Sequence, residues 1–511
     1  MALFNSILSW GLRKRIHQIE LFVKYPHDVQ EEGLLKLVAT AKDTEWGKKF
    51  DYKSIANSDE FKKRVPLQDY ETIKPYVIRL RQTEQNLLWP TEIKWFSKSS
   101  GTTNDKSKFI PVSQESLEDC HYKGGKDVLT IYCHNNPETE IFKGKFLTMG
   151  GSRKMNNFSN DSYYGDLSSI LIHNSPFWTE FIRTPERSVA LMEDFEKKID
   201  VIAEASIKEN VTSVAGVPSW TLVLLKHILE FSGKKSLQEV WPDMELLIHG
   251  GVNFDPYRSQ FKKILPYEGL KYLETYSASE GFFGIQDREV PNEMLLMLDY
   301  GIYYEFQPIE EVGKEFPKTL RLEEVETGVN YAIIISTNAG LWRYQIGDTI
   351  QFTTLNPYRI RVAGRIKHFI NAFGEELIID NANQALDIAC KKTGAVIKEY
   401  TAAPVYMGDH GSGAHEWLIE FEKRPADFDY FEEVLDNALK SINSDYEAKR
   451  TGNLTLRMPI VRAMNEGTFW RWLKAKGKLG GQHKVPRLSN SRKFVDEILE
   501  IAGISEPDYA E

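Results

Sequence analysis

The chain has little cysteine, with only Cys120, Cys133 and Cys390 among 511 residues. These three are widely spaced, form no Cys-x-x-Cys pair and leave an odd residue over. The pattern argues against a disulfide framework and against a cysteine zinc site, and it is typical of proteins in a reducing compartment. We therefore expect a cytoplasmic protein.

The chain also lacks a long apolar run and an excess of positive charge. No apolar segment approaches the roughly 20 residues that span a bilayer, so we expect no transmembrane segment. Residues 1–10 are apolar before they are basic and have no small-residue cleavage site, which argues against a secretory signal. The net charge of −9 gives no basic footprint, so we do not expect nucleic acid as a partner.

Near the N-terminus, apolar residues recur at helical spacing beside a basic run. Leu8, Leu12, Ile16 and Ile19 form the apolar stripe, and residues 13–15 are basic. The pattern predicts an amphipathic helix that packs on its own domain. A helix lying on a membrane surface is the open alternative.

The length of the chain and its 41% hydrophobic content predict two or more domains with real cores. From residue 186 onward, strand and helix patterns alternate, which indicates α/β layers. The expected elements are a helix at 186–208, a strand at 211–217, a helix at 219–231, and strands at 245–248 and 271–276.

Residues 331–362 change to short β runs, which predict a β meander or part of a barrel. Turns at 338–340 and at 347–348 separate the first three runs. The sequence Gly-Arg-Ile-Lys at 364–367 is the best linker, and another α/β pattern follows it. We therefore predict an α/β protein with a large domain at 1–366, built of mixed sheets flanked by helices plus the barrel-like part, and a small mobile C-terminal α/β domain at 367–511.

Residues 98–112 read Lys-Ser-Ser-Gly-Thr-Thr-Asn-Asp-Lys-Ser-Lys-Phe-Ile-Pro-Val, between apolar segments. Gly101 lets the backbone turn tightly and approach a ligand. Hydroxyl and amide donors with Lys106 or Lys108 nearby form an anion site suited to a polyphosphate. The stretch does not match the P-loop of NTPases, and a polar surface turn is the alternative interpretation.

Three further polar segments follow predicted strands: His-Gly-Gly-Val from His249, Tyr-Ser-Ala-Ser-Glu from Tyr276 and Tyr-Gln-Ile-Gly-Asp from Tyr344. A late glycine-rich loop at 477–487 ends in Gly-Gln-His-Lys-Val-Pro-Arg. Ligand sites of α/β proteins gather at the carboxyl ends of strands, where such loops meet.

The order and spacing of these segments resemble the adenylate-forming superfamily of acyl-AMP ligases and luciferases. Within it they look most like the Gretchen Hagen family of auxin-responsive acyl acid amido synthetases, in a bacterial-type version. The signatures Ser-Ser-Gly-Thr-Thr-x4-Lys-x2-Pro, Tyr-x2-Ser-Glu-Gly, Tyr-x2-Gly-Asp and Gly-Gln-x-Lys-x-Pro-Arg all occur in order. The resemblance spans nearly the whole chain.

The resemblance implies a nucleotide site whose residues take distinct roles. The residues that would hold the ATP phosphates are Ser99, Ser100, Thr102, Thr103 and Lys108. The residues that would form the adenine slot are Gly250, Gly251 and Val252 on one side and Tyr276, by stacking, on the other. Ser279 would line the nucleotide site, Glu280 would bind Mg²⁺, and Asp348 would accept hydrogen bonds from the ribose.

The resemblance also implies a two-step reaction. A small carboxylic acid would attack the α-phosphate of ATP to give an acyl-AMP, and an amine, expected to be an amino acid, would then take the acyl group. Lys484 would reach into the site for adenylation, and Lys367 falls at the hinge about which the small domain rotates. Charge builds on phosphoryl oxygens as pyrophosphate leaves, so positioning and cations supply most of the catalysis.

Three departures from the family pattern make substrate identity unsafe to transfer. Asn104 and Asp105 replace small residues in the polar loop, and Ser277-Ala278 changes the middle of the Tyr-Ala-Ser-Ser-Glu motif. Gln345 occupies the place of a frequent arginine, although Arg343 lies two residues earlier and would point to the same side of a strand.

Each assigned residue also has a structural interpretation. Glu280 would interact with a helix dipole, Tyr276 would be a core aromatic, Asp348 would be a turn residue and Lys484 a solvated loop lysine. At the level of function, the alternatives are a ligase with a thiol acceptor such as coenzyme A, and a non-catalytic nucleotide-binding or membrane-peripheral protein.

Overall fold

The computed structural model describes residues 14–99, 108–148, 156–159, 161–192, 195–251, 254–314, 316–366, 369–370, 377–405, 413–443, 446–447, 450, 456–477, 484–489 and 491–504. The chain divides into two compact units. The first consists mainly of residues 1–101, 105–252 and 261–362, and the second mainly of residues 363–511 with 253–260. A domain boundary between residues 366 and 367 stays a prediction.

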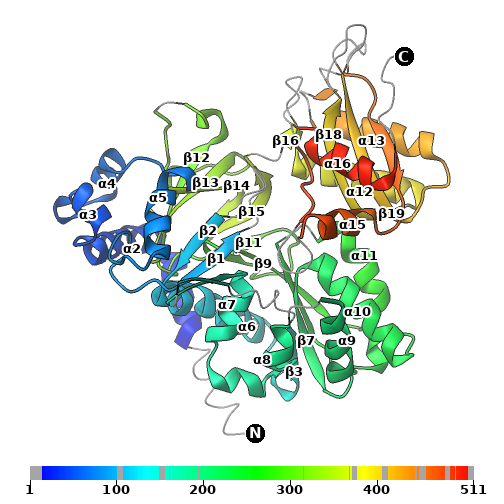
Figure 1. The fold of residues 1–511 in the computed structure, drawn as a ribbon, viewed down its shortest axis with the longest axis horizontal. Coiled ribbons are helices and arrows are strands. Elements are labelled where there is room, and N and C mark those ends of the chain that lie inside the picture. The colour runs from blue at the N-terminus through cyan, green and yellow to red at the C-terminus, as the bar shows by residue number, and fades with distance from the viewer. Residues whose placement is uncertain are drawn as a thin grey trace. The chain divides into compact units, whose positions relative to one another are not determined.

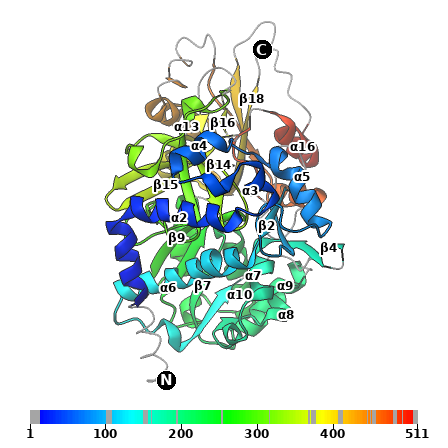
Figure 2. The ribbon, with the colours of Figure 1, turned by 90° about the vertical axis from the view of Figure 1, so that its left-hand side faces the viewer.

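The first unit begins with helices that cover one face of its main sheet, as Figure 2 shows. They are residues 14–24, α2 (Pro26–Ala41), α3 (Glu45–Lys49), α4 (Ser58–Arg64) and α5 (Tyr70–Arg81). The side chains of Thr44, Asn57 and Asp69 accept hydrogen bonds from the first-turn amides of α3, α4 and α5. These N-caps explain why the polar segment at 26–81, which contains several prolines, forms several short helices.

The first described helix is held by a buried ionic network. The Arg15 guanidinium lies 2.6 Å from carboxylate oxygens of both Asp127 and Asp299. Tyr300 donates a hydrogen bond to Asp127, and Lys123 lies 3.1 Å from Asp299. Because Ile19 and Phe22 of the same helix are also buried, this structure favours the packed-helix interpretation for residues 14–24.

We expect Arg15→Ala to lower the free energy of unfolding by about 2–4 kcal/mol, because Asp127 is 1% exposed and loses its charged partner. Burial alone would raise the pKa of Asp299, but Arg15 and Lys123 hold that pKa below its usual value. A lowered carboxylate pKa stabilises the fold above about pH 4, the unfolded value, and this contribution is lost as the pH falls further. Urea unfolding at pH 7 and pH 3 measures both effects.

The control for this prediction is Lys14→Ala, because Lys14 lies on the same helix and is exposed. It removes one positive charge without touching the network. An Arg15→Ala variant as stable as Lys14→Ala at pH 7, or a stability difference that persists unchanged at pH 3, would contradict the role given to Arg15.

A small sheet carries the start of the polar loop. Its strands are β1 (Trp95–Ser99), β2 (Lys108–Val112), β4 (Asn156–Ser159) and β5 (Ser162–Gly165), in the order β2-β1-β5-β4. Strands β1 and β2 are antiparallel, with Ser99 opposite Lys108. Both ends of the polar loop are therefore fixed side by side.

The main sheet has eleven described strands in the order β12-β13-β14-β15-β11-β10-β9-β8-β7-β3-β6. Strands β6, β3, β7, β8 and β9 run parallel, whereas β9–β10, β10–β11, β11–β15, β12–β13 and β13–β14 pair antiparallel. The sheet thus changes from parallel to antiparallel between β9 and β10, in the mixed α/β fold that we predicted (Figure 1).

The strands have the following bounds: β3 (Lys145–Thr148), β6 (Arg183–Thr184), β7 (Val211–Gly216), β8 (Leu246–Gly250), β9 (Lys271–Ala278), β10 (Gly281–Ile285), β11 (Met294–Leu296), β12 (Ile302–Pro308), β13 (Asn330–Thr337), β14 (Tyr344–Leu355) and β15 (Tyr358–Arg365). One sequence expectation is wrong here. Residues 347–348 do not form a turn between two strands, because β14 continues through them. Gly347 instead has a positive φ of 89°, and the pairing register with β13 shifts beside it.

The further helices of the first unit are α6 (Lys123–Asn135), α7 (Leu167–Asn174), α8 (Arg187–Ala190), α9 (Phe195–Ser206) and α10 (Pro218–Ser232). The next helix, α11 (Asp255–Ile264), begins in residues that belong to the second unit and ends in the first. A π-helix, η2 (Ser116–Tyr122), precedes α6. Short 3₁₀ turns are η1 (Tyr52–Ser54), η3 (Ile141–Lys143), η4 (Phe177–Phe181), η5 (Leu237–Glu239), η6 (Ile309–Glu311) and η7 (Leu322–Glu324). The single helix expected at 186–208 is wrong, since α8 ends at Ala190 and α9 begins at Phe195.

The second unit is a three-layer α/β arrangement. Its sheet has the order β18-β19-β20, with β18 (Val396–Val405), β19 (Ala414–Lys423) and β20 (Ile460–Met464). Along β19, Trp417, Ile419 and Phe421 enter a core with α12 (Ile379–Thr393) and α13 (Phe428–Ile442). Leu418 faces the other way, toward α15 (Thr468–Ala475) and α16 (Lys493–Ala502). A two-stranded ribbon, β16 (Phe369–Ile370) and β17 (Leu377–Ile378), precedes α12.

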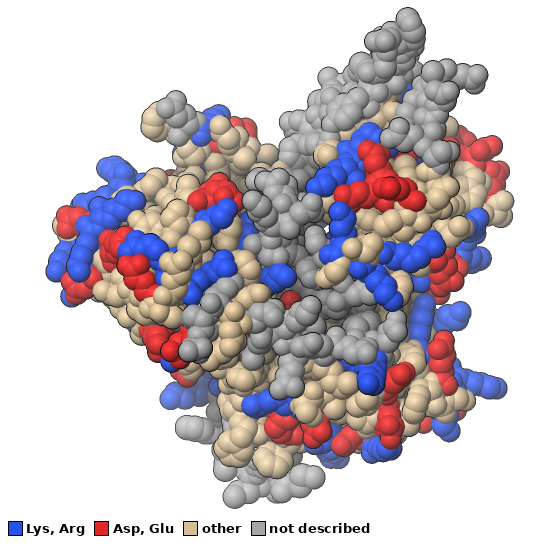
Figure 3. All heavy atoms as spheres, viewed as in Figure 1, with Lys and Arg blue, Asp and Glu red and all other residues tan. Residues whose placement is uncertain are grey.

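No helix among the described residues is long and apolar enough to cross a membrane. On the face of the molecule drawn in Figure 3, basic and acidic side chains are interspersed.

Candidate functional site

The candidate site lies where β8, β9 and the turn into β10 meet. Gly250 ends β8 and stands opposite Thr275 of β9, one residue before Tyr276. A Cβ atom at Gly250 would lie 2.4 Å from the carbonyl oxygen of Thr275, and Gly251 has a positive φ of 79°. Glycine is therefore required for this close approach and turn. Val252, the third residue predicted for this wall, lies outside the described residues.

A hydrogen bond joins the predicted adenine and ribose residues. The Tyr276 hydroxyl donates to Oδ2 of Asp348 at 2.8 Å, and both side chains are buried. The Tyr276 ring also lies 4.8 Å from the Phe283 ring, centroid to centroid. Asp348 follows the left-handed Gly347 within β14, so this bulge determines where its carboxylate lies. The structure therefore brings two residues separated by 72 positions into direct contact.

A second hydrogen bond connects the small sheet to the turn after β9. The hydroxyl of Ser97 in β1 lies 2.8 Å from that of Ser279, and both are buried. Ser99 follows two residues later on the same strand. The strand end that leads into the polar loop thus lies beside the turn that contains Glu280. Ser100, Thr102 and Thr103 lie outside the described residues, as does the side chain of Ser99.

Two tyrosines, Tyr70 and Tyr344, connect the lysine at the end of the polar loop with the carboxylate of Glu280. The Nζ of Lys108 lies 5.8 Å from the centre of the Tyr70 ring, and the Tyr70 hydroxyl accepts a hydrogen bond from the Phe109 amide. Burial raises the pKa of Tyr344, and the charge of Glu280 raises it further, as do those of Tyr70 and Asp69. Lys108, Tyr70, Tyr344 and Glu280 therefore belong to one neighbourhood.

The carboxylate expected to bind Mg²⁺ has surroundings that fit this role. The described residues contain no group of three or more His, Cys, Asp or Glu side chains that could hold a metal by themselves. Mg²⁺ bound with a nucleotide needs only one or two protein carboxylates, because phosphate oxygens and water complete its octahedron. Glu280, which follows the buried Ser279 in the turn between β9 and β10, supplies one such carboxylate.

The predicted catalytic lysine begins a segment that is fixed to β18 of the second unit. Lys484 is exposed, and Val485 after it is buried. The Ala402 amide donates to the Arg487 carbonyl at 2.9 Å, and the Ser489 amide donates to the Ala402 carbonyl at 3.1 Å. Arg487 also pairs with Glu399. Lys367, the predicted hinge residue, lies outside the described residues.

Arg343 differs from the expectation drawn from the sequence. It is not a strand residue beside Gln345, because its backbone has a φ of 45° and β14 starts one residue later. Its guanidinium contacts both oxygens of Glu305 at 2.8 Å and donates to the carbonyls of Lys62 and Val65. The Arg343 side chain therefore connects α4 to the main sheet. It does not replace the arginine that family members often have at the position of Gln345.

Three residues of this neighbourhood received no role from the sequence: Ser97, Tyr70 and Tyr344. Ser97 lies two positions before Ser99, and the period of two along a strand places both on one face, which was a usable signal. Tyr344 is the first residue of the Tyr-x2-Gly-Asp signature, whereas Tyr70 lies in no motif that could have pointed to it.

A cavity of about 240 Å³ lies elsewhere, where β8 begins rather than where it ends. Its lining includes the carboxylates of Glu140, Asp243, Glu245 and Glu268, with Lys143 as the cation. These like charges would repel a polyphosphate, so this cavity is not the nucleotide site.

Three domain descriptions match the chain in order: the GH3 family N-terminal domain at residues 15–270, the GH3 family central domain at 295–365 and the GH3 family C-terminal domain at 380–493. The chain is 22% identical to indole-3-acetic acid-amido synthetase GH3.3 of Arabidopsis thaliana, over 93% of this chain and 91% of that protein. It is 24% identical to jasmonoyl–L-amino acid synthetase GH3.5 of Oryza sativa subsp. japonica, over 95% and 96%.

Solved structures show the same fold. AtGH3.15 acyl acid amido synthetase in complex with 2,4-DB matches with a TM-score of 0.78 and 16% identity, over 94% of both chains. The 2-hydroxyisobutyryl-CoA ligase in complex with 2-HIB-AMP matches with a TM-score of 0.57 and 12% identity, over 93% of this chain and 91% of the ligase.

Proposed function

Because the chain belongs to the GH3 family of adenylate-forming enzymes, we propose that it activates a small carboxylic acid with Mg-ATP and transfers the acyl group to an amine. The observation that carries the proposal is the meeting of Gly250, Tyr276, Ser279 and Asp348 at the β9–β10 junction, with Glu280 in the same turn. The named amido synthetases among its relatives support an amino acid as the amine.

In the first step, the substrate carboxylate attacks the α-phosphorus of ATP, and the bond from that phosphorus to the pyrophosphate oxygen breaks. Asp348, oriented by Tyr276, would accept the ribose hydroxyls, and the adenine would lie between Tyr276 and the glycine wall at 250–252. Residues 99–103 and Lys108 would hold the phosphates. Bound Mg²⁺, ligated by Glu280, would neutralise phosphate charge.

In the second step, the amine nitrogen attacks the acyl carbon of the acyl-AMP, AMP leaves, and the nitrogen loses a proton. No enzyme nucleophile is needed, because the mixed anhydride is already activated. We propose that Lys484 acts in the first step, and that residues from 367 onward form a domain that rotates about Lys367 between the steps. Cytoplasmic location and a bacterial-type assignment are further parts of the proposal.

The test is a product analysis on the purified chain. Aromatic, indolic, jasmonate-like and fatty acids are screened for pyrophosphate release, and each acyl-AMP is offered amino acids or coenzyme A. We expect acid-dependent ATP–pyrophosphate exchange, AMP as the nucleotide product, and an amide. Thioester formation without any amide would support a thiol acceptor instead, and nucleotide binding without exchange would support a non-catalytic protein.

We expect Glu280→Gln to reduce acid-dependent exchange by about 10²-fold at 1 mM Mg²⁺, the scale for losing one preorganised electrostatic contact. The amide keeps the shape of the side chain but removes its charge, so part of the activity should return as Mg²⁺ is raised. The measurement is exchange rate against Mg²⁺ concentration. Glu289→Gln, an exposed carboxylate on the loop after β10, is the control. A Mg²⁺ dependence identical to that of the unaltered protein would exclude Glu280 as the ligand.

A further inference from the structure

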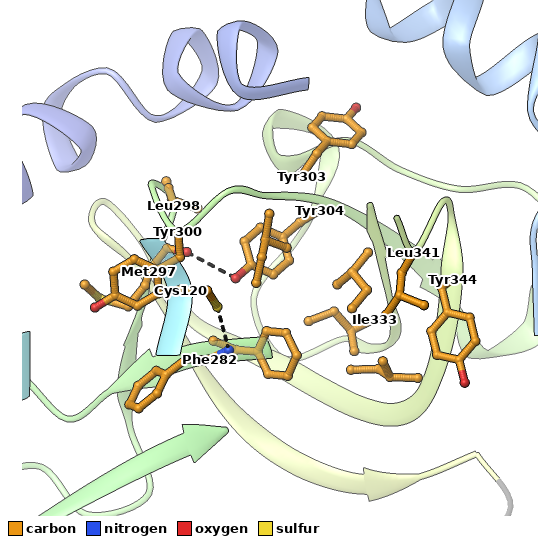
Figure 4. Close-up of a cluster of buried hydrophobic side chains, with 14 of the residues drawn as sticks. Cys120, Phe282, Met297, Leu298, Tyr300, Tyr303, Tyr304, Ile333, Leu341 and Tyr344 are labelled. Atoms are coloured by element: carbon orange, nitrogen blue, oxygen red, sulfur yellow. Dashed lines mark hydrogen bonds between the residues drawn. The ribbon is translucent and has the colours of Figure 1, made fainter. Parts of the chain in front are cut away.

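The hydroxyl of Tyr344 is buried without a hydrogen-bond partner in the described part of the chain. The side chain is fully buried, with 0% of its surface exposed. Figure 4 shows its ring at the edge of the hydrophobic cluster, with the hydroxyl directed away from the other side chains. A buried polar group that remains unpaired destabilises the fold, and a phenylalanine would fill the same space without this penalty. The hydroxyl therefore calls for an explanation.

The backbone places Tyr344 beside the start of α5. Gln68 and Tyr344 form a parallel bridge, and the Gln345 amide donates to the Gln68 carbonyl at 2.8 Å. Asp69 and Tyr70 follow immediately. Tyr70 in turn contacts the beginning of β2 through the Phe109 amide and lies under the ammonium group of Lys108. The start of β14, where Tyr344 lies, is thus joined through Gln68 to the segment whose Tyr70 contacts β2, the strand that closes the polar loop.

The surroundings of Tyr344 determine whether its hydroxyl is protonated. Glu280, on the turn after β9, and Asp69, at the N-cap of α5, are both close enough to act on its ionisation. Burial is the main reason that the phenol pKa lies well above its ordinary value, and these charges raise it further. The hydroxyl therefore stays protonated and is available as a hydrogen-bond donor.

The position of Tyr344 on β14 selects the part of the nucleotide that it meets. Asp348, which would accept the ribose hydroxyls, lies four residues further along the same strand. Strands rise about 3.3 Å per residue, so the two residues are at most about 13 Å apart along β14, and the bulge at Gly347 shortens this. A nucleotide with its ribose at Asp348 can extend its phosphates over that distance, toward Glu280 and Lys108.

We propose that Tyr344 is a nucleotide-binding residue, whose hydroxyl donates a hydrogen bond to a β- or γ-phosphate oxygen of ATP beside Glu280. This inference rests on the proposed function. It explains why tyrosine and not phenylalanine occupies this position, although no described group of the protein forms a hydrogen bond with the hydroxyl. A donor to a charged oxygen in a buried site forms a strong hydrogen bond.

The test is Tyr344→Phe, which removes one oxygen atom and keeps the ring. We expect its affinity for Mg-ATP to fall about 10- to 100-fold, the scale of one hydrogen bond to a charged group. Its affinity for adenosine and AMP should stay within about twofold of the unaltered protein. Without nucleotide, its melting temperature should be equal or higher, because an unpaired buried hydroxyl is removed. Calorimetric titration and thermal unfolding measure these quantities.

The matched control is Tyr304→Phe. Tyr304 belongs to the same cluster and is fully buried, but its hydroxyl donates to the Met297 carbonyl at 3.1 Å (Figure 4). We expect this control to lower the melting temperature and to leave the affinity ratio of ATP to AMP unchanged. The ratio thus separates a phosphate contact from a merely structural effect.

The outcomes of this experiment separate the two proposals. If the unaltered protein binds ATP and shows acid-dependent exchange, but Tyr344→Phe binds ATP equally well, the role of Tyr344 is refuted and the proposed function stands. An equal loss for ATP, AMP and adenosine also refutes a phosphate contact. If the unaltered protein itself shows no acid-dependent exchange, the proposed function fails, and ATP binding by Tyr344→Phe still decides the contact.

Discussion

Replacing Lys484 with alanine should slow acid-dependent ATP–pyrophosphate exchange by about 10²- to 10³-fold, with the KM for ATP nearly unchanged. The reason is that charge builds on the phosphoryl oxygens only as pyrophosphate leaves, and a lysine aimed at that charge stabilises the transition state more than bound ATP. A residue of this kind lowers kcat rather than ground-state binding. Initial rates over a range of ATP concentrations at saturating acid provide the measurement.

The second half-reaction makes this prediction more specific. If Lys484 acts only in adenylation, the Lys484→Ala variant should convert a chemically synthesised acyl-AMP and an amino acid to the amide at close to the unaltered rate. Lys392→Ala is the control, because Lys392 is an exposed lysine of α12 in the same unit. A lysine that is simply solvated would give equal exchange rates in Lys484→Ala and Lys392→Ala, and that result would refute its assigned role.

Replacing Glu305 with alanine should lower the free energy of unfolding by about 3–5 kcal/mol, the range for breaking a buried ion pair. Glu305 is 1% exposed and Arg343 6%, so the lost partner leaves a guanidinium buried away from water. The Thr319 hydroxyl, which donates to Glu305 at 2.7 Å, also loses its acceptor. Urea unfolding measures the change. It can be followed by tryptophan fluorescence, because Trp342, the residue before Arg343, is buried in the folded protein.

The double variant Glu305→Leu with Arg343→Met tests the physical cause. Because it removes both charges and keeps apolar volume, we expect it to be more stable than either single variant. The exposed pair of Lys391 and Asp387 on α12 is the comparison, and Asp387→Ala should change stability by less than about 0.5 kcal/mol. A Glu305→Ala variant as stable as Asp387→Ala would contradict the role of the buried pair.

Much of the fold follows from local patterns that the sequence displays directly. The apolar runs at 245–248 and 271–276 are β8 and β9, and Pro218 at a helix start correctly predicted α10. The hairpin turn at 338–340 is confirmed, with Gly340 at a positive φ of 84°. These elements depend on residues close together in the chain, which is why the sequence alone predicts them.

The errors arise where the sequence pattern is compatible with two structures. A stripe with a period of 3.6 does not distinguish one helix from two that share a buried face, so α8 and α9 were predicted as one. A glycine followed by an aspartate is typical of both a hairpin turn and a bulge, and pairing with β13 selects the bulge. Arg343 was misplaced because its partner, Glu305, is 38 residues away.

The candidate site shows the same division between local and distant information. The sequence predicted which segments carry Tyr276, Ser279 and Asp348, but not the bond from Tyr276 to Asp348 or from Ser97 to Ser279. Those contacts depend on strand order, in particular on β1 lying near the end of β9. The roles of these residues toward a nucleotide stay predictions.

The change of strand direction between β9 and β10 has a consequence for sequence variation. Parallel neighbours require long crossovers, whereas β9 and β10 are joined by Ser279 and Glu280 alone. Crossovers tolerate inserted residues, but the length of a two-residue hairpin connection sets its turn type and the register of its strands. One extra residue would therefore have to form a bulge beside Ser279 and Glu280, or β10 would slip against β9 by one residue and turn Phe282 and Phe283 to the opposite face. We therefore expect relatives to differ in length after β7 and β8 and to keep this connection free of insertions and deletions.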